Sequence, residues 1–419
     1  MSEASLFNFD VIRNPYPLYK ELRDREPVHF EPAMNVHVVL RYDLVREAIR
    51  DTETFSSRYD GFLQESQRIM FEQAAPEIQQ QLMDLNARMV EVPPTMLTLD
   101  EPDHTRYRSL VNELFTASQI RLAEPTVQAV VDANMAPLLE RTSGEFMSQF
   151  AFPVPLRIIG DRLGIPEDGR EFFDHAATQA ASALRLTPLT GEQMVERAQT
   201  ALDLQQFLIG IVEARRAEPQ QDMITILANA KLADEDRLLT HGECVSVLNQ
   251  FLVAGHETTS SAFGWGMLLL CRHPEVQDEL RGNAKLIKTF VEEILRLEAP
   301  VQGLPRLVTR DTELGGHPLK AGDMVMLRYG AANRDERQFE APDTLNVHRH
   351  KAGAQLAFGA GVHHCIGAPL ARQELNLGFQ ALLDRLQNIR LAEGANPEAE
   401  VSFILRNLPE LPITYELRG

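Results

Sequence analysis

The stretch Leu356–Leu375, LAFGAGVHHCIGAPLARQEL, places a single cysteine, Cys365, between glycines and directly ahead of a helix-forming segment. Glycine is costly in ordered structure unless the backbone must bend or approach another group closely. Pro369 suits the first turn of a helix, so Cys365 is expected just before the helix N-terminus, with the amides of residues 366–368 near its sulfur. Such a position favours the thiolate, which is the reactive and metal-binding form of cysteine.

The competing interpretation of Cys365 is a buried cysteine in a turn. Gly359, Gly361 and Gly367 flank the thiol and would let the backbone pass close to a flat ligand, so we prefer a ligating role. The sequence lacks the C-x-x-C-H pattern of covalent haem, and no second cysteine lies nearby to complete a zinc or iron–sulfur site. Cys244 and Cys271 lie on one expected helix, about 40 Å apart, and are interpreted as core residues.

The bulk composition indicates a globular protein with a large core. The chain has 419 residues, 44% of them hydrophobic, and a formal net charge of −19, which argues against nucleic-acid binding. No apolar run is long enough to cross a bilayer, and the N-terminal segment resembles neither a signal peptide nor an anchor. We therefore expect a cytoplasmic protein without a membrane anchor, built as one domain over residues 1–419.

Periodicity predicts a mainly α protein with a small β-rich N-terminal side. Strands are expected at PVHFE, at VHVVLR and within 305–328, and no structure is assigned to the Met- and Gln-rich segment 60–98. The longest helix starts near Thr240 and stops before Pro274. The main expected helices cover 16–25, 43–50, 101–116, 240–273, 286–297 and a segment from Pro369 through Leu386.

The cysteine loop resembles the haem-binding loop of cytochrome P-450, F-x-x-G-x-x-x-C-x-G, with Phe358, Gly361, Cys365 and Gly367 in the fixed positions. The longer pattern of soluble bacterial members also matches, although Ala360 and His364 depart from frequent choices at variable positions. The resemblance implies a cytochrome P-450 fold, a large helical bundle around haem b (iron protoporphyrin IX). Cys365 would be the axial iron ligand, and haem would otherwise be held without covalent bonds.

The centre of the long helix resembles the oxygen-activation motif of the same family. Residues 254–259, AGHETT, interrupt an apolar helix with polar side chains. The resemblance implies that Glu257 supplies protons and that Thr258 stabilises bound oxygen, with Ala254 and Gly255 against the cofactor. A helix kink with a solvated acid is the alternative, whereas a zinc protease motif fails because position 260 is serine.

Two further sets of residues fit the resemblance and are spread along the chain in the order of the family. Glu293 and Arg296 form an E-x-x-R motif, which implies a buried structural network with Arg349 rather than a catalytic role. The haem propionates need cationic partners, because they are carboxylates. By resemblance these partners are His104, Arg108, Arg306 and His363, and the loop residues Phe358, Gly359, Gly361 and Gly367 also bind the cofactor.

The expected substrate pocket is apolar, which favours a hydrophobic substrate. Its walls are placed by resemblance, and each residue could equally belong to the core. The candidates are Val92, Met96, Leu97, Leu252, Val253, Ala254, Val301, Leu304, Ile404 and Leu405.

The resemblance implies a monooxygenase that inserts one oxygen atom of O2 into a small or medium hydrophobic substrate by hydroxylation or epoxidation. No flavin or nicotinamide motif is present, and the resemblance implies that a separate ferredoxin or flavodoxin with its reductase supplies the electrons. We expect this partner to dock near Arg106 and Arg372. The alternatives are a peroxygenase or isomerase on the same fold, a non-enzymatic haem sensor or carrier, and a thiol enzyme without haem. We expect a monomer.

Overall fold

The computed structural model of this protein describes residues 5–182, 189–232 and 235–418. Contacts between Cα atoms divide the chain into two compact units. The first comprises residues 1–55, 117–158 and 256–419, and the second comprises 56–116 and 159–255. The boundaries fall within β3 (Phe55–Ser56), α8 (Pro153–Leu163) and α12 (His241–Arg272). The expectation of a single domain stays a prediction.

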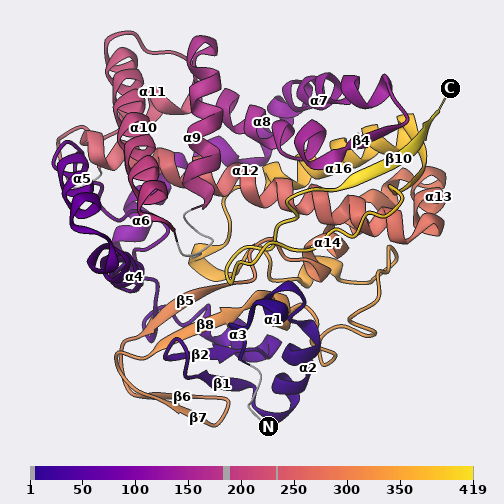
Figure 1. Cartoon of the computed structure of the whole chain (residues 1–419), viewed down its shortest axis with the longest axis horizontal. Helices are drawn as coiled ribbons and strands as arrows, with labels where there is room; N and C mark the ends of the chain where they lie inside the picture. Colours follow the sequence, from indigo (N-terminus) through magenta and orange to yellow (C-terminus); the bar gives the residue numbers. More distant parts are fainter. Residues whose placement is uncertain (1–4, 183–188, 233–234, 419) are drawn as a thin grey trace. The chain divides into compact units, whose positions relative to one another are not determined.

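The main sheet has the strand order β1-β2-β8-β5-β3 and combines the N-terminal strands with strands from the second half of the chain. β1 (Val28–Glu31) and β2 (Val36–Val39) pair antiparallel, β2 runs parallel to β8 (Met324–Arg328), and β8 is antiparallel to β5 (Gly303–Val308). Figure 1 shows these strands side by side, with helices α2 and α3 close to them. The predicted strands at PVHFE, VHVVLR and 305–328 are therefore confirmed, and β1, β2, β5 and β8 belong to one sheet.

Two smaller sheets complete the first unit. β6 (Thr312–Leu314) and β7 (His317–Leu319) form a hairpin, and both residues of its turn, Gly315 and Gly316, have positive φ angles of 59° and 84° that suit glycine. The other sheet has the order β4-β10-β9, with β4 (Ser143–Glu145), β10 (Pro412–Leu417) and β9 (Leu386–Leu391).

Aromatic rings join three of the helices of the first unit. Phe379 of α16 lies 5.5 Å from Phe263 of α12 and 5.2 Å from Phe290 of α14, measured between ring centroids. These contacts hold three long helices together, because aromatic side chains bury large apolar areas. The helices that lie within this unit are α1 (Phe9–Arg13), α2 (Tyr16–Arg25), α3 (Tyr42–Ala48), α7 (Ala117–Leu139), α13 (Pro274–Gly282), α14 (Ile287–Leu297), α15 (Tyr329–Ala332) and α16 (Ala368–Arg385), with a π-helical turn at Met147–Ala151.

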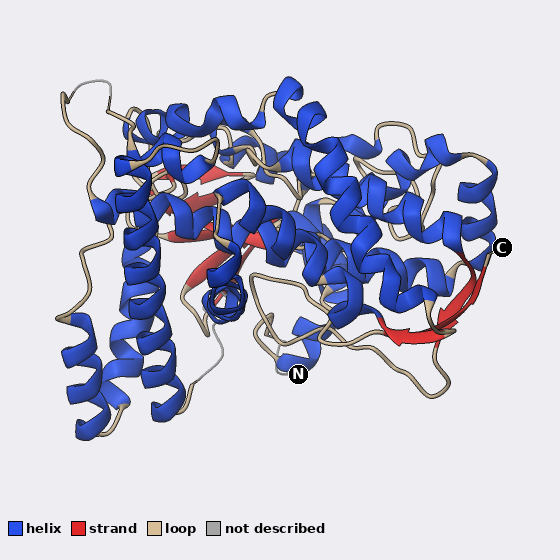
Figure 2. Ribbon diagram, turned by 90° about the horizontal axis from the view of Figure 1, so that it is seen from above, coloured by secondary structure: helices blue, strands red, loops and turns tan. Residues whose placement is uncertain are grey.

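The regular elements described in the second unit are helices, apart from Ser56 of β3 and an isolated bridge between Lys231 and Leu238, and Figure 2 shows how strongly helices dominate the fold. The segment 60–98, to which no structure was assigned from the sequence, contains two of these helices. The capping box expected at the start of α12 is present: Thr240 Oγ1 accepts from the Glu243 amide at 3.2 Å, and Glu243 accepts from the Thr240 amide at 2.7 Å. The helices are α4 (Asp60–Gln73), α5 (Pro76–Asn86), α6 (Asp103–Asn112), α9 (Arg170–Ser182), α10 (Gly191–Ala217) and α11 (Met223–Ala228).

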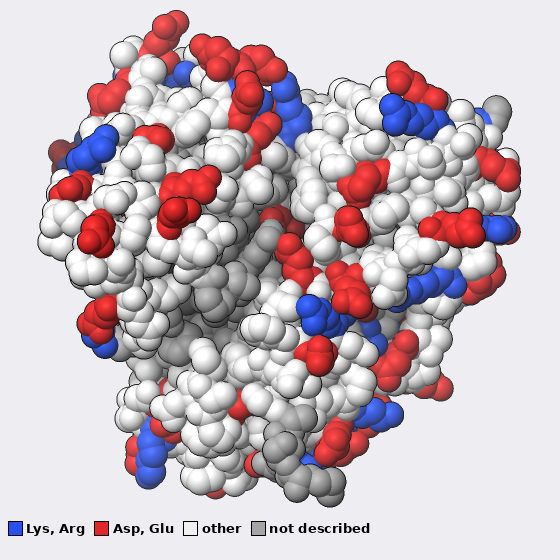
Figure 3. Space-filling view, viewed as in Figure 1, with Lys and Arg blue, Asp and Glu red and all other residues white. Residues whose placement is uncertain are grey.

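Among the described helices, none is both long enough and apolar enough to span a membrane. On the face shown in Figure 3, acidic side chains are more prominent than basic ones, and the two kinds are interspersed. This distribution agrees with the net charge of −19.

Candidate active site

The cysteine loop directly precedes α16, as predicted. Gly359 and Gly361 have φ angles of 67° and 68°, in the left-handed region that favours glycine. A Cβ on Gly361 would lie 3.4 Å from the carbonyl oxygen of Ile49, so a side chain there would also crowd the backbone. The amide of Cys365 donates to the carbonyl of Phe358 at 2.9 Å, which closes the loop and presents the thiol.

Cys365 differs from the other two cysteines in its surroundings. Cys365 is exposed, Cys244 is buried and Cys271 is partly buried. Burial raises the pKa of the Cys244 thiol to about 11 and that of the Cys271 thiol to about 12. Both therefore stay protonated at neutral pH, and Cys365 is the cysteine suited to ligate a metal.

An arginine of α16 braces the aromatic residue of the loop. The Arg372 guanidinium lies 4.5 Å from the ring centroid of Phe358 and donates to Glu292 of α14 at 2.5 and 3.1 Å. The ion pair holds the cation over the ring face, which is a favourable cation–π arrangement. Arg106, the other arginine expected to meet an electron donor, pairs within the second unit with Glu235 at 2.9 Å.

The polar centre of α12 combines buried and accessible residues. Glu257 is 2% exposed, Thr258 is half-buried, and Ala254 is exposed although Leu252, two positions earlier, is buried. A Cβ on Gly255 would fall 2.9 Å from Ile159, so glycine is required for close packing there. Ser260 donates back to the carbonyl of His256, four positions earlier, at 2.9 Å.

Glu257 has a partner that the sequence motifs did not indicate. Nδ2 of Asn407 donates to Oε1 of Glu257, while Oε2 lies 3.6 Å from Nε2 of His256. Asn407 belongs to the irregular segment before β10, 150 positions along the chain from Glu257. Because no short motif joins the two residues, only the folded chain brings them into contact.

The four residues expected at the propionates lie in different surroundings. Arg306 of β5 is 2% exposed and donates to the carbonyl of Pro305 at 2.7 Å, and its Nε has no hydrogen-bond partner within the described part of the chain. Burial raises the pKa of Tyr329, and the Arg306 guanidinium acts in the opposite direction. A buried guanidinium with a spare donor fits a carboxylate ligand.

Of the other cationic candidates, His363 belongs to the first unit, and His104 and Arg108 belong to the second. His363 is half-buried in the cysteine loop. His104 and Arg108 share a face of α6, where His104 is buried and Arg108 is half-buried. Burial lowers the pKa of His104, although Glu101, 3.3 Å from its Nδ1, acts in the opposite direction.

Glu293, Arg296 and Arg349 form one buried network. Arg296 donates to both oxygens of Glu293 at 2.6 and 2.9 Å, and Arg349 donates to Oε1 at 2.9 Å. Arg296 also donates to the carbonyls of Asn333 and Thr344, both at 3.1 Å. The network therefore joins α14 to the loop that follows α15, which is the structural task expected of these residues.

The candidate substrate residues lie in different surroundings. Val301 and Leu405 form an isolated antiparallel bridge, and the Ile404 carbonyl accepts from Gln302 at 2.7 Å, so these residues lie together. In the second unit, Met96 and Leu252 are buried and Val253 is half-buried. Val92 and Leu97, which were also expected in the pocket wall, are 43% and 45% exposed, an exposure typical of surface residues. Leu304 is half-buried on β5.

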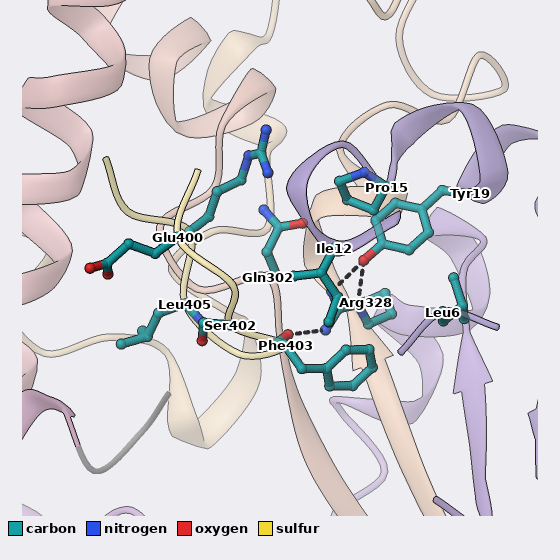
Figure 4. Close-up of a pocket in the computed structure, with 11 residues that line it drawn as sticks. Leu6, Ile12, Pro15, Tyr19, Gln302, Arg328, Glu400, Ser402, Phe403 and Leu405 are labelled. Atoms are coloured by element: carbon teal, nitrogen blue, oxygen red, sulfur yellow. Dashed lines mark hydrogen bonds between the residues drawn. The ribbon is translucent and has the colours of Figure 1, made fainter. Parts of the chain in front are cut away.

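A small cavity lies behind the segment that carries Leu405. It has a volume of about 10 Å³, enough for one water molecule, and its walls include Tyr19, Gln302 and Arg328. Figure 4 shows Arg328 bridging Tyr19 and the carbonyl of Phe403, and its Nη1 donates to that carbonyl at 2.6 Å. The cavity is too small for an organic substrate. The hydrogen bond from Arg328 to the carbonyl of Phe403 holds the 402–406 segment against its wall.

The cysteine loop, the acid and hydroxyl on α12 and the buried Arg306 define a haem-thiolate oxygenase. The profile of the cytochrome P450 family matches residues 28–409, and the chain belongs to this family of monooxygenases. The chain is 34% identical over 420 residues to nocardicin C N-oxygenase of Nocardia uniformis, covering 98% of both chains. It is 32% identical over 418 residues to vitamin D(3) 25-hydroxylase of Pseudonocardia autotrophica, covering 98% of this chain and 96% of that protein.

A solved structure agrees with the sequence comparisons. Cytochrome P450 CYP109Q5 from Chondromyces apiculatus superposes with a TM-score of 0.84 at 29% identity, over 99% of this chain and 98% of the other. The match confirms the mainly α cytochrome P-450 fold expected from the sequence. The family uses a haem-thiolate cofactor, a substrate, O2 and redox partners.

Proposed function

We propose that this protein inserts one oxygen atom of O2 into a small or medium hydrophobic molecule, by hydroxylation or epoxidation. A separate ferredoxin or flavodoxin, with its reductase, supplies the electrons. The observation that carries the proposal is the exposed thiol of Cys365, held by a glycine-rich loop at the N-terminus of α16. The family assignment provides the reaction class, and the residues of this chain provide the specific roles.

The cofactor of the proposal is haem b, and the thiolate of Cys365 would hold its iron. The residues fit such a group: the loop glycines allow close approach, and Arg306 offers a buried donor to a propionate. We assign His363, His104 and Arg108 to the propionates as well, and Phe358, Gly359, Gly361, Gly367, Ala254 and Gly255 to contacts with the porphyrin. The haem would supply oxygen binding and O–O cleavage, which a thiolate ligand favours.

Glu257 and Thr258 are the proposed catalytic residues. Monooxygenation consumes two electrons and two protons for each O2, and releases one oxygen atom as water. Glu257 is a buried carboxylate on the helix that carries the hydroxyl of Thr258, so the pair is suited to pass protons inward. We assign the hydrophobic substrate to a wall that includes Val301, Leu304, Ile404 and Leu405.

The first test is the reduced carbon-monoxide difference spectrum of the purified protein beside Cys365→Ser. A strongly red-shifted Soret band in the wild type, lost in the variant, is the expected result. Cys271→Ser is the matched control, because it removes a thiol whose pKa is raised to about 12 and should leave the band unchanged. A colourless protein, or a histidine-type band in both proteins, would contradict the proposal.

The substrate class is tested by titrating the ferric protein with testosterone, vitamin D3, hexadecanoic acid and toluene. Displacement of iron-bound water by an apolar compound shifts the Soret band, so saturable shifts identify ligands. The proposal expects saturable shifts with apolar compounds and none with a polar control such as glucose. Shifts confined to charged, water-soluble compounds would refute the hydrophobic assignment.

The redox partner is tested on one helix, with Arg372→Gln as the variant and Arg385→Gln as its control. Both arginines lie on α16 and pair with an acid, Glu292 for Arg372 and Asp132 for Arg385. We expect slower reduction by a [2Fe–2S] ferredoxin for Arg372→Gln alone, with a loss that shrinks at high ionic strength. A wild-type reduction rate in Arg372→Gln would remove Arg372 from the docking surface.

A further inference from the structure

We propose that Asn407 is a positioning residue for Glu257, whose carboxylate it holds in one orientation for proton transfer. The inference rests on the proposed function, which makes Glu257 the proton donor. Its basis is the hydrogen bond from Nδ2 of Asn407 to Oε1 of Glu257, made across 150 positions of the chain. The resemblance to the family motif on α12 includes no partner for this carboxylate.

Burial makes this hydrogen bond important. Glu257 is 2% exposed and Asn407 is 3% exposed. Burying a carboxylate has a high free-energy cost unless hydrogen-bond donors replace its hydration. The orientation of the buried carboxylate therefore depends on those donors. The nearest ring nitrogen of His256 lies 3.6 Å from the other carboxylate oxygen, beyond hydrogen-bond length. The amide of Asn407 therefore orients the carboxylate more strongly than His256 does.

The backbone around Asn407 is itself fixed to α12. The carbonyl of Arg406 accepts from Ser261 Oγ at 2.5 Å and from Trp265 Nε1 at 2.8 Å. The carbonyl of Asn407 accepts from the Glu400 amide at 2.9 Å. The bonds from Ser261 and Trp265 attach the segment to α12 one turn and two turns after Glu257. The side-chain amide of Asn407 therefore has little freedom to move away.

An amide suits a group that binds and releases a proton. Its NH2 remains a donor at every pH, and its oxygen is an acceptor for the protonated acid. Oδ1 of Asn407 is buried and has no hydrogen-bond partner among the described residues, so this acceptor is not committed elsewhere in that part of the chain. Aspartate at this position would present only acceptors when ionised and would repel Glu257.

Misplacing the acid has a measurable consequence. Productive turnover joins substrate, O2, two electrons and two protons into hydroxylated product and water. When proton delivery fails, the same two electrons and two protons leave with O2 as hydrogen peroxide. The ratio of hydrogen peroxide to NADH consumed therefore reports the position of the acid, and it can be measured with or without substrate.

The experiment compares Asn407→Leu, which keeps the branched side-chain shape and removes the amide, with Ser261→Ala. The control removes a neighbouring hydrogen bond to the same segment but leaves the Trp265 bond and Glu257 untouched. Holoproteins are assayed with a [2Fe–2S] ferredoxin and its reductase, without substrate and with testosterone. We expect the peroxide ratio to rise about threefold in Asn407→Leu alone, with a larger solvent isotope effect on NADH oxidation.

A second readout does not depend on turnover. The carboxylate stretch of Glu257, assigned in the infrared difference between wild type and Glu257→Gln, should shift in Asn407→Leu and stay in place in Ser261→Ala. The carbon-monoxide spectrum should be unchanged in both, which shows that the haem site is intact. Asn407→Gln, which keeps an amide, should recover part of the wild-type peroxide ratio.

The outcomes separate this inference from the role of Glu257. If Glu257→Gln raises the peroxide ratio and Asn407→Leu adds nothing in that background, the amide acts through Glu257, as proposed. Equal peroxide ratios in Asn407→Leu and Ser261→Ala, or an unshifted carboxylate band, overturn the positioning role while the role of Glu257 stands. A wild-type ratio in Glu257→Gln overturns the proton-donor role first, and the positioning role with it.

Discussion

Nε of Arg349 donates a hydrogen bond at 2.9 Å to Oε1 of Glu293, which lies 56 positions earlier in the chain. The acceptor is fully buried and also receives Nε of Arg296 at 2.6 Å. One carboxylate therefore pairs with two guanidinium groups away from water. Such a group is costly to disrupt, because removing it leaves uncompensated buried charges.

The first prediction concerns this carboxylate. Glu293→Gln should destabilise the fold by about 3–5 kcal/mol, since two arginines lose their counter-charge. Urea unfolding followed by circular dichroism measures the loss. Arg385→Gln, which breaks an exposed ion pair with Asp132, is the control and should cost below about 1 kcal/mol. A Glu293→Gln protein as stable as the control would show that the network is not structural.

The second prediction concerns acid stability in the second unit. Burial alone would raise the pKa of Glu243, but hydrogen bonds from Arg237, the Thr240 amide and Tyr107 lower it to about 2, below its ordinary value of 4.5. A lowered folded-state pKa stabilises the protein above the unfolded value, and this contribution disappears as pH falls through the folded value. The stabilisation by Glu243 is therefore complete at pH 7 and declines between about pH 4.5 and 2.

The measurement is the free energy of unfolding of wild type and Glu243→Gln between pH 7 and pH 3. The variant should be less stable at pH 7, and the gap should narrow as pH falls below about 4.5. Asp84→Asn serves as the control, because Asp84 is exposed and its replacement at pH 7 should change the stability by less than about 1 kcal/mol. A constant gap for Glu243→Gln would contradict the proposed ionisation.

The third prediction concerns thiol reactivity. At pH 8, iodoacetamide should leave Cys244 and Cys271 of the native holoprotein unmodified, because burial raises both thiol pKa values well above the assay pH. Cys365 should be protected by iron and become reactive once an excess of apomyoglobin removes the haem. Mass spectrometry of the peptides assigns the sites. Rapid labelling of Cys365 before haem removal would contradict ligation.

The fourth prediction separates backbone strain from cofactor binding. Gly361→Ala and Gly394→Ala both place a side chain at positive φ, 68° and 76°, and each should cost about 1 kcal/mol of stability. Only Gly361→Ala should also lower the haem-to-protein ratio, measured by absorbance, because Gly361 lies in the cysteine loop. Equal haem content in both variants would show that the loop tolerates a side chain at this position.

The sequence predicted the elements whose signals are local. The glycines, Cys365 and Pro369 specify a turn followed by a helix within a few residues, and the structure begins α16 at Ala368. The apolar periodicity of α12 and its capping box at Thr240 are equally local, and the family follows from such motifs. Helices α4 and α5 in the segment 60–98 were missed, and neither begins with a side-chain N-cap of the kind that marks the start of α12.

By itself, the sequence determined which residue is the candidate iron ligand, which helix carries the acid and which family contains the chain. Only the tertiary structure decided that Asn407 contacts Glu257, that Arg349 shares the carboxylate of Glu293 and that Leu405 bridges Val301. The reason is physical. Backbone conformation depends on near neighbours, which are visible in a short stretch of chain. The surroundings of a buried charge depend on residues that lie far apart in sequence and meet only when the core excludes water.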